Sequence, residues 1–390
     1  MNHAASFSTL IWHLITPEYP PQPGGVSDYT HLIANGLAAA GDEVHVWGPQ
    51  AEDEVADASS VAVHRDLGRF SGSDLRRVGR MLDQFKGPRR LLVQWVPHGY
   101  GYRSMNLGFC FWLWRRARQG DKVEVMVHEP FLSFREGSWK QSGVATVHRL
   151  MTMILLRAAS RVWMTIPAWE AHWRPYALGR SLKFNWLPVP SNIPVVDDPD
   201  GVRAIRLRYT NGAGALVGHF GTCDRHTTGL LLKSVPALLQ NGKPQAMLLM
   251  GQGSELMRDE LIHKQPALAD RVYATGALAS EELSLHIGAC DVMLQPYIDG
   301  VSSRRTSTMV ALAHGVPVVT TSGKLTEPLW AGSGAVAMAP VGDVSTLVRT
   351  TQRLLPDAPA RRRMSAAAKS LYAERFDVSH IIDSLRGTNL

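Results

Sequence analysis

Apolar runs of strand length alternate with helical patterns along the chain. Residues 9–15 form a short apolar run that predicts a buried strand, and residues 26–37 repeat apolar side chains at helical spacing. Gly41 follows the helical pattern in the position of a C-cap glycine, and residues 43–47 predict a second strand. A strand, a crossover helix and a further strand make the βαβ unit of a parallel sheet.

The alternation continues on both sides of a proline-rich segment, residues 187–201, which we expect to be a linker. Before it, the pattern predicts strands at 90–96, 123–127 and 161–166, with helices at 107–118 and 146–159. After it, strands are predicted at 215–220, 246–250, 272–275, 292–295 and 316–320, and helices at 230–239, 281–289, 306–313 and, as one or two helices, 360–385. We therefore expect an α/β fold of two successive doubly wound domains, residues 1–195 and 196–370.

Composition agrees with two globular domains and limits the partners. The 390 residues are 45% hydrophobic, which excludes a mostly disordered chain. The formal net charge is +7, and residues 1–195 carry +5 of it, with 21 Lys and Arg against 16 Asp and Glu. This excess favours phosphates or an anionic membrane surface, whereas basic residues scattered among α/β elements argue against nucleic acid.

The sequence also bears on location. No uncharged apolar run reaches the ~18–20 residues that span a bilayer, and no secretory signal is apparent at the start. Three isolated cysteines give neither a disulfide framework nor a metal-ligand spacing, which favours a reducing compartment. We expect a cytoplasmic protein that is soluble or peripheral at the inner face of the membrane.

Candidate chemistry in the first domain follows predicted strands, where open α/β sheets bind ligands. Gly24 and Gly25 lie between the first strand and its helix, where backbone N–H groups can approach an anion; a plain glycine turn is the alternative. Their loop lacks the G-x-G-x-x-G pattern, which argues against a dinucleotide dehydrogenase. His128 and Glu129 end a strand and His98 has a similar place, so these side chains could bind sugar hydroxyls or handle protons, or be ordinary loop residues.

The second domain carries two polar clusters at the ends of predicted strands. Both clusters supply N–H groups, hydroxyl groups and guanidinium groups. One cluster consists of Gly221, Thr222 and Arg225, and the other of Ser302, Arg304, Arg305 and Thr306. Arginine can bind two phosphate oxygens at once, and a helix N-terminus also favours anions. Two such clusters in one domain favour an anionic ligand over two solvated loops.

Residues 107–118 form an aromatic helix with a basic end. Such a helix could lie at a membrane interface. The alternative is a buried helix whose arginines complement its dipole, and apolar helices are more often buried than interfacial.

Taken together, these segments resemble the family 4 glycosyltransferases. The stretches that carry the resemblance are residues 23–26 with the helix and residues 41–44 that follow, 187–194, 250–255, and 291–296 through 311–320. The resemblance implies the GT-B fold, in which two Rossmann-like domains face a central cleft, and a final helix, about 371–390, that packs back on the N-terminal domain. It implies a metal-independent, retaining transfer of a sugar from a nucleotide-diphosphate sugar to a glycan, lipid-linked or small-molecule acceptor, with no further cofactor.

The sequence departs from the family at its paired glutamates. Those two positions fall at Ser302 and Val310, so neither is acidic, and the second normally holds the nucleotide ribose. Glu327 matches a later acidic position of the family better. Donor binding must therefore use altered contacts or have been lost.

The working hypothesis is a glycosyltransferase active in polysaccharide biosynthesis. We assign His128 and Glu129 to catalysis, His98 and Tyr29 to the acceptor side, and Gly24, Gly25 and the second-domain clusters with Glu327 to the donor phosphates. Two alternatives stay open: a non-catalytic GT-B protein that binds a sugar or a partner, and a GT-B enzyme of other chemistry, such as a phosphorylase or an epimerase.

Overall fold

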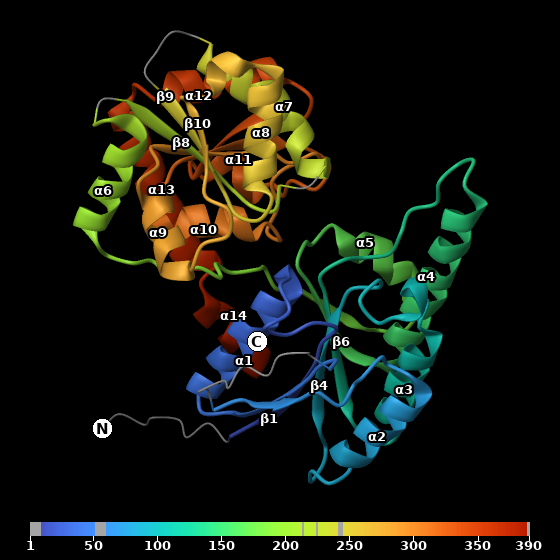
Figure 1. Ribbon diagram of the computed structural model, residues 1–390. Coiled ribbons are helices and arrows are strands. Elements are labelled where there is room, and N and C mark those ends of the chain that lie inside the picture. The colour runs from blue at the N-terminus through green and yellow to red at the C-terminus, as the bar shows by residue number, and fades with distance from the viewer. Residues whose placement is uncertain (1–8, 51–59, 213, 224, 241–244, 388–390) are drawn as a thin grey trace, which may run out of the picture. The chain divides into compact units, whose positions relative to one another are not determined.

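The computed structural model describes residues 9–50, 60–212, 214–223, 225–240 and 245–387, apart from the side chains of residues 225–227. The chain divides into two compact units: unit 1 is residues 1–188 with 378–390, and unit 2 is residues 189–377. Each unit is built on a parallel sheet with helices on both of its faces (Figure 1). The prediction of two doubly wound α/β sheets is confirmed.

The sheet of unit 1 runs in the order β3-β2-β1-β4-β5-β6-β7. Its strands are β1 (Ile11–Ile15), β2 (Glu43–Trp47), β3 (Ala62–His64), β4 (Arg90–Trp95), β5 (Lys122–Val127), β6 (Ala159–Met164) and β7 (Lys183–Trp186). The inner strands are buried on both faces, as parallel strands between two helix layers are, and this explains why most of their residues are apolar.

The helices of unit 1 form two layers. They are α1 (Gly25–Ala39), α2 (Gly72–Leu82), α3 (Leu107–Arg118), α4 (Trp139–Ala158), α5 (Trp169–Trp173) and α14 (Val378–Arg386), with 3-10 turns at Tyr102–Ser104 and Arg174–Ala177. α1 packs with α14, while α3 packs between α2 and α4 on the opposite face (Figure 1). Ser71 caps α2 and Asn106 caps α3, so local sequence fixes where both helices begin.

The sheet of unit 2 runs in the order β10-β9-β8-β11-β12-β13. Its strands are β8 (Ala215–Phe220), β9 (Gln245–Met250), β10 (Val272–Ala274), β11 (Val292–Gln295), β12 (Val318–Ser322) and β13 (Val336–Pro340). Its helices are α6 (Pro199–Thr210), α7 (Arg225–Leu239), α8 (Ser254–Lys264), α9 (Ser280–Gly288), α10 (Thr306–His314), α11 (Leu329–Gly332), α12 (Val344–Leu354) and α13 (Ala358–Arg375), with a 3-10 turn at Pro266–Leu268.

The helices of unit 2 also lie in two layers. α7 packs with α8 and α12 over a core that includes Val217, Leu249 and Leu294, and α9, α10 and α13 cover the other face. The apolar core thus fixes β8 and β11 side by side at the centre of the sheet. None of the described helices is both long and apolar enough to cross a membrane.

The predicted linker is shorter than the sequence suggested. Residues 197–201 were expected to be part of it, but α6 begins at Pro199. Asp198 accepts a hydrogen bond from the N–H of Gly201, and proline at the first helical position needs no N–H partner. The prolines at 188, 190 and 194 remain in extended chain without helix or strand.

Candidate functional site

The strand order of each sheet changes direction at one point, and ligands of α/β sheets bind at such switch points. In unit 1 the point lies between β1 and β4, and in unit 2 between β8 and β11. The candidate residues of unit 1 are Gly24, Gly25, Tyr29, His98, His128 and Glu129, and those of unit 2 are Gly221, Thr222, Arg225, Ser302, Arg304, Arg305, Thr306 and Glu327.

The N-terminus of α1 already holds a carboxylate. Oε1 of Glu18 accepts hydrogen bonds of 3.0 Å from the N–H groups of Val26 and Ser27. A Cβ at position 24 would lie 2.2 Å from that oxygen, so a larger residue there would push the carboxylate aside, whereas Gly25 has open space. A phosphate at this helix end would therefore have to displace Glu18.

His128 is buried at the end of β5. Its Nε2 lies 2.7 Å from Oε1 of Gln94 on β4, so Nε2 carries the proton and donates. Burial lowers the pKa of His128 to about 3, and the ring therefore stays neutral at pH 7 with a lone pair on Nδ1. The ring of Tyr29 meets it edge-on at 4.7 Å between centroids. His128 can accept a hydrogen bond from a hydroxyl group, but it is a poor proton donor.

His98 and Glu129 form a second pair at the same edge. Nδ1 of His98 lies 3.3 Å from Oε2 of Glu129, and both side chains are about half exposed. The hydrogen bond to Glu129 raises the pKa of His98. The structure thus separates two histidines that looked alike in the sequence: one is buried and neutral, and the other is exposed and readily protonated.

Gly221 and Thr222 follow β8 at the switch point of unit 2. The N–H of Gly221 donates to Met250, and a Cβ on Gly251 would lie 2.7 Å from the carbonyl oxygen of Gly221. Gly251 also has φ +105°. Both the lack of room for a Cβ and this backbone conformation therefore favour glycine at this position. Thr222 is exposed, and Arg225 begins α7 with its side chain outside the described part of the structure.

The arginines that follow β11 share one carboxylate. Asp299 accepts a hydrogen bond from Arg304 at 3.0 Å and pairs with Arg305 through its other oxygen. The guanidinium group of Arg305 also stacks on the ring of Tyr297, 4.5 Å from its centroid. Burial disfavours the ionised carboxylate, but the two guanidinium groups outweigh this effect and hold the pKa of Asp299 below its ordinary value.

Hydrogen bonds to Glu327 hold the loop between β11 and α10 in place. This buried carboxylate accepts hydrogen bonds from the N–H and hydroxyl groups of Ser303 and, at 2.7 Å, from Nε1 of Trp330. The Oγ of Ser302 is buried and has no hydrogen-bond partner among the described residues. Val310 is fully buried in α10. Glu327 therefore positions the loop, and Val310 serves packing.

α10 begins at Thr306 without a side-chain cap. α10 follows Arg304 and Arg305 directly in the sequence, and both a helix N-terminus and guanidinium groups favour anions. This arrangement differs from α1, where Glu18 already fills the equivalent position.

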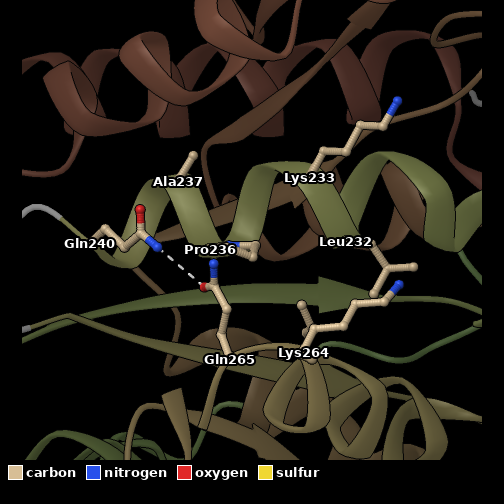
Figure 2. Close-up of a pocket in the computed structure, with 8 residues that line it drawn as sticks. Leu232, Lys233, Pro236, Ala237, Gln240, Lys264 and Gln265 are labelled. Carbon is tan, nitrogen blue, oxygen red and sulfur yellow. Dashed lines mark hydrogen bonds between the residues drawn. The ribbon is translucent and has the colours of Figure 1, made fainter. Parts of the chain in front are cut away.

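Among the described residues, neither a metal-binding cluster nor a hollow on unit 2 adds further candidate residues to these strand ends. Within the described part of the chain, no group of three or more His, Cys, Asp and Glu could hold a metal ion. A hollow of about 360 Å³ lies between α7 and α8 (Figure 2). Gln240 points across it to Gln265 at 3.3 Å, and Lys233 points away. The predicted site residues do not line it.

Part of the chain is similar in sequence to known glycosyltransferases. Residues 214–357, most of unit 2, match the model of the family described as Glycosyl transferases group 1. The 2-deoxystreptamine glucosyltransferase of Streptomyces kanamyceticus is 30% identical over 207 residues, 48% of this chain and 51% of that protein. The chain therefore spans about half the length of this curated relative.

Solved structures extend the similarity to both units. Sucrose-phosphate synthase from Thermosynechococcus elongatus has a TM-score of 0.76 at 18% identity, covering 97% of this chain and 98% of that one. Anabaena HepE, solved in complex with UDP and glucose, has a TM-score of 0.70 at 17% identity, with the same coverage. The fold is GT-B.

Within this GT-B chain, sequence reasoning missed three residues that shape the site. Glu18, Gln94 and Asp299 hold, respectively, the end of α1, the ring of His128 and the two arginines. Asp299 stands five residues before Arg304, and this spacing in a loop was the one usable signal. The contacts of Glu18 and Gln94 depend on neighbouring strand ends and leave no pattern in the sequence.

Proposed function

We propose that the chain is a glycosyltransferase that moves a sugar from a nucleotide-diphosphate sugar to an acceptor with retention of configuration. The observation that carries the proposal is the cluster of Arg304, Arg305 and the uncapped end of α10 at the switch point of unit 2. This cluster lies in the segment that matches the group 1 glycosyltransferases. In this proposal unit 2 binds the donor and unit 1 the acceptor.

The leaving diphosphate is the group whose charge develops in the reaction. Arginine side chains and helix N–H groups that are already in place stabilise this charge without a metal ion. Asp299 holds both guanidinium groups before the donor arrives. The donor diphosphate then shares or replaces Asp299 as their partner. Gly221, Thr222 and Arg225 contribute from the adjacent strand end.

The contact to the ribose must differ from that of the family 4 enzymes. Ser302 takes the place of one glutamate and Val310 of the other, and both are buried. Glu327 acts on donor binding through the loop that it anchors. The apolar Val310 favours the alternative of a non-catalytic sugar-binding protein, and turnover of a donor separates the two functions.

On unit 1, His128 and its neighbours suit hydroxyl groups. The free lone pair of neutral His128 accepts a hydrogen bond from a sugar hydroxyl, and Tyr29 packs against its ring. The pair of His98 and Glu129 offers an exposed base on the acceptor side. Positioning and leaving-group stabilisation then supply most of the rate acceleration.

We place the reaction in the cytoplasm, at the inner face of a membrane, with a lipid-linked glycan as acceptor. Support comes from the α3–α4 surface, defined here as the exposed side chains of α3, α4 and the loop before α4. It presents Phe111, Trp114, Phe134, Trp139 and Leu150 among Arg115, Arg118, Arg135, Lys140 and Arg157. Aromatic and basic side chains together suit an anionic lipid interface.

A donor screen tests the proposed function. The purified chain is incubated with radiolabelled nucleotide sugars, beginning with UDP-glucose, and with a lipid-containing cell extract. We expect turnover of one donor and loss of nucleoside diphosphate affinity in Arg304→Ala. Arg258→Ala, which removes a partly exposed arginine of unit 2, is the matched control. Binding without turnover favours the non-catalytic protein, release of sugar phosphate or an isomerised donor without acceptor favours other GT-B chemistry, and no binding rejects the proposal.

A further inference from the structure

A second cavity lies at the amino edge of the sheet in unit 1, at the opposite ends of the strands from the candidate site. Its volume is about 650 Å³, within the range of small-molecule pockets. The first residues of four neighbouring strands, β1, β4, β5 and β6, lie at or near its wall, together with the end of α14. Every lining residue belongs to unit 1.

The wall of this cavity is strongly basic. Its charged side chains are Lys86, Arg89, Arg90, Lys122, Arg161, Arg386 and Glu124. Six cations therefore face one carboxylate. Five of the six cations belong to residues 1–195, the part of the chain that carries a formal charge of +5.

Three of the cations are used by the fold itself. Arg89 donates to Asp121 at 2.6 Å, Arg90 donates to Glu124 at 2.6 Å, and Arg386 lies 3.1 Å from Asp42. Arg89 also donates to carbonyl oxygens at the end of α2, and Arg90 to the carbonyl oxygen of Leu385 at the end of α14. These arginines complement helix C-termini, which is a common structural role.

The other three cations have no such role. Lys86 and Lys122 are exposed and have no carboxylate within ion-pair distance among the described residues. The guanidinium group of Arg161 stacks on Trp163, 5.0 Å from the ring centroid, and likewise lacks a carboxylate partner there. Glu124 accepts hydrogen bonds from Arg90 and Trp163. Lys86, Lys122 and Arg161 are thus the cations of the wall that have no ion-pair partner among the described residues.

We propose that this cavity is a binding site for a small soluble molecule that carries two or more phosphate charges. Lys122 of β5, Arg161 of β6 and Lys86 of the loop before β4 line the same cavity, which suits a compact polyanion, and arginine can bind phosphate oxygens in pairs. Leu10, Ile11 and Pro88 are the apolar side chains of the wall, too few for a lipid-binding face. A ligand here also contacts Arg386 and Gly387, and so holds α14 against the sheet.

Binding of inorganic pyrophosphate to the full chain tests the proposal. Calorimetry gives the affinity, and hydrogen exchange of peptides covering residues 86–90, 122–124 and 383–387 locates the ligand. In Lys122→Gln/Arg161→Gln we expect at least about tenfold weaker binding and no protection of these peptides, because each charge-assisted hydrogen bond contributes about this factor. Arg76→Gln/Arg80→Gln removes two exposed arginines of α2 and should bind as the unchanged chain does.

The hydrogen-exchange pattern separates this site from the proposed donor site. Protection confined to residues 299–308 would place pyrophosphate at the donor site and overturn the inference, as would equal affinity in both double variants. Vesicles of phosphatidylglycerol form a second arm. Protection of the cavity peptides by vesicles but not by pyrophosphate would show that a lipid headgroup is the ligand and overturn the assignment to a soluble molecule.

Discussion

The carboxylate of Glu18 accepts a hydrogen bond of 3.0 Å from the backbone N–H of Val26, and a Cβ at the intervening Gly24 would touch it. Glu18, a loop residue, thereby occupies the N-terminus of α1, where the sequence predicts a phosphate. The glycine pair has two different roles: Gly24 makes room for Glu18, and Gly25 begins α1.

Alanine at each glycine should separate these roles. Gly24→Ala places a methyl group 2.2 Å from Glu18 Oε1 and should lower the free energy of unfolding by about 1–3 kcal/mol. Gly25→Ala meets no atom within 4 Å and should change it by less than about 1 kcal/mol. Urea unfolding measures both values, and equal losses would contradict the predicted clash.

Removal of Asp299 should destabilise unit 2 in a way that phosphate can repair. Asp299→Ala leaves two partly buried guanidinium groups without their carboxylate, which should cost about 2–3 kcal/mol. Thermal unfolding should show that a nucleoside diphosphate stabilises this variant more than the unchanged chain. Asp259→Ala, which removes an exposed partner of Arg258, is the control. Equal stabilisation by the ligand in all three proteins would argue against phosphate binding at these arginines.

Unfolding of unit 1 should respond to mild acid through His13. Burial, with smaller contributions from His45, His64, Arg89 and Arg116, lowers the pKa of His13 to about 3. The unfolded chain therefore binds a proton below about pH 6.5 that the folded chain does not. Stability from this residue is present above pH 6.5 and is lost as the pH falls toward 3.

Asn at this position should remove part of that slope. His13→Asn keeps an acceptor for the indole N–H of Trp47, which donates to Nδ1 of His13 at 3.2 Å. Between pH 7 and pH 5 the unchanged chain should lose about 2 kcal/mol more than the variant, at about 1.4 kcal/mol per pH unit. Urea unfolding at both pH values measures the difference, and parallel losses would show that His13 is not the group that titrates.

The α3–α4 surface should bind anionic vesicles. Trp139 is 80% exposed and Phe134 is 57% exposed, and Arg149 stacks on Phe134. Phe134→Ser/Trp139→Ser should weaken flotation with phosphatidylglycerol vesicles by more than about tenfold, because each aromatic side chain contributes roughly 1.5 kcal/mol when buried. Leu256→Ser removes an equally exposed apolar side chain of unit 2. A similar loss in that control would mean that the binding is not localised to this surface.

Sequence patterns predicted the inner strands best. β8 lies at Ala215–Phe220 as predicted, because a strand buried on both faces is mostly apolar. β3 is three residues long and lies at the sheet edge, so it leaves no such run. α4 begins at Trp139 rather than at residue 146, because the polar start capped by Ser138 resembles a loop.

Of the candidate site, the sequence predicted the strand ends but not the contacts. Strand ends indicated His128, which follows β5 next to the switch point between β1 and β4, and Arg304, which follows β11 at the switch point of unit 2. The sequence could not distinguish a buried His128 from an exposed His98, since both simply follow a strand. The roles of the candidate residues in sugar transfer stay predictions until the donor screen is done.

Unit 1 is discontinuous in the sequence, and this has a consequence for biosynthesis. Arg90 and Asp42 take their partners from residues 385 and 386, which the ribosome adds only after the whole of unit 2. A nascent chain can therefore complete unit 2 while unit 1 still lacks α14. Until α14 is made, Gly36 of α1 lacks its packing partner Ile382. We therefore expect unit 2 to finish folding before unit 1, although translation of unit 1 begins first.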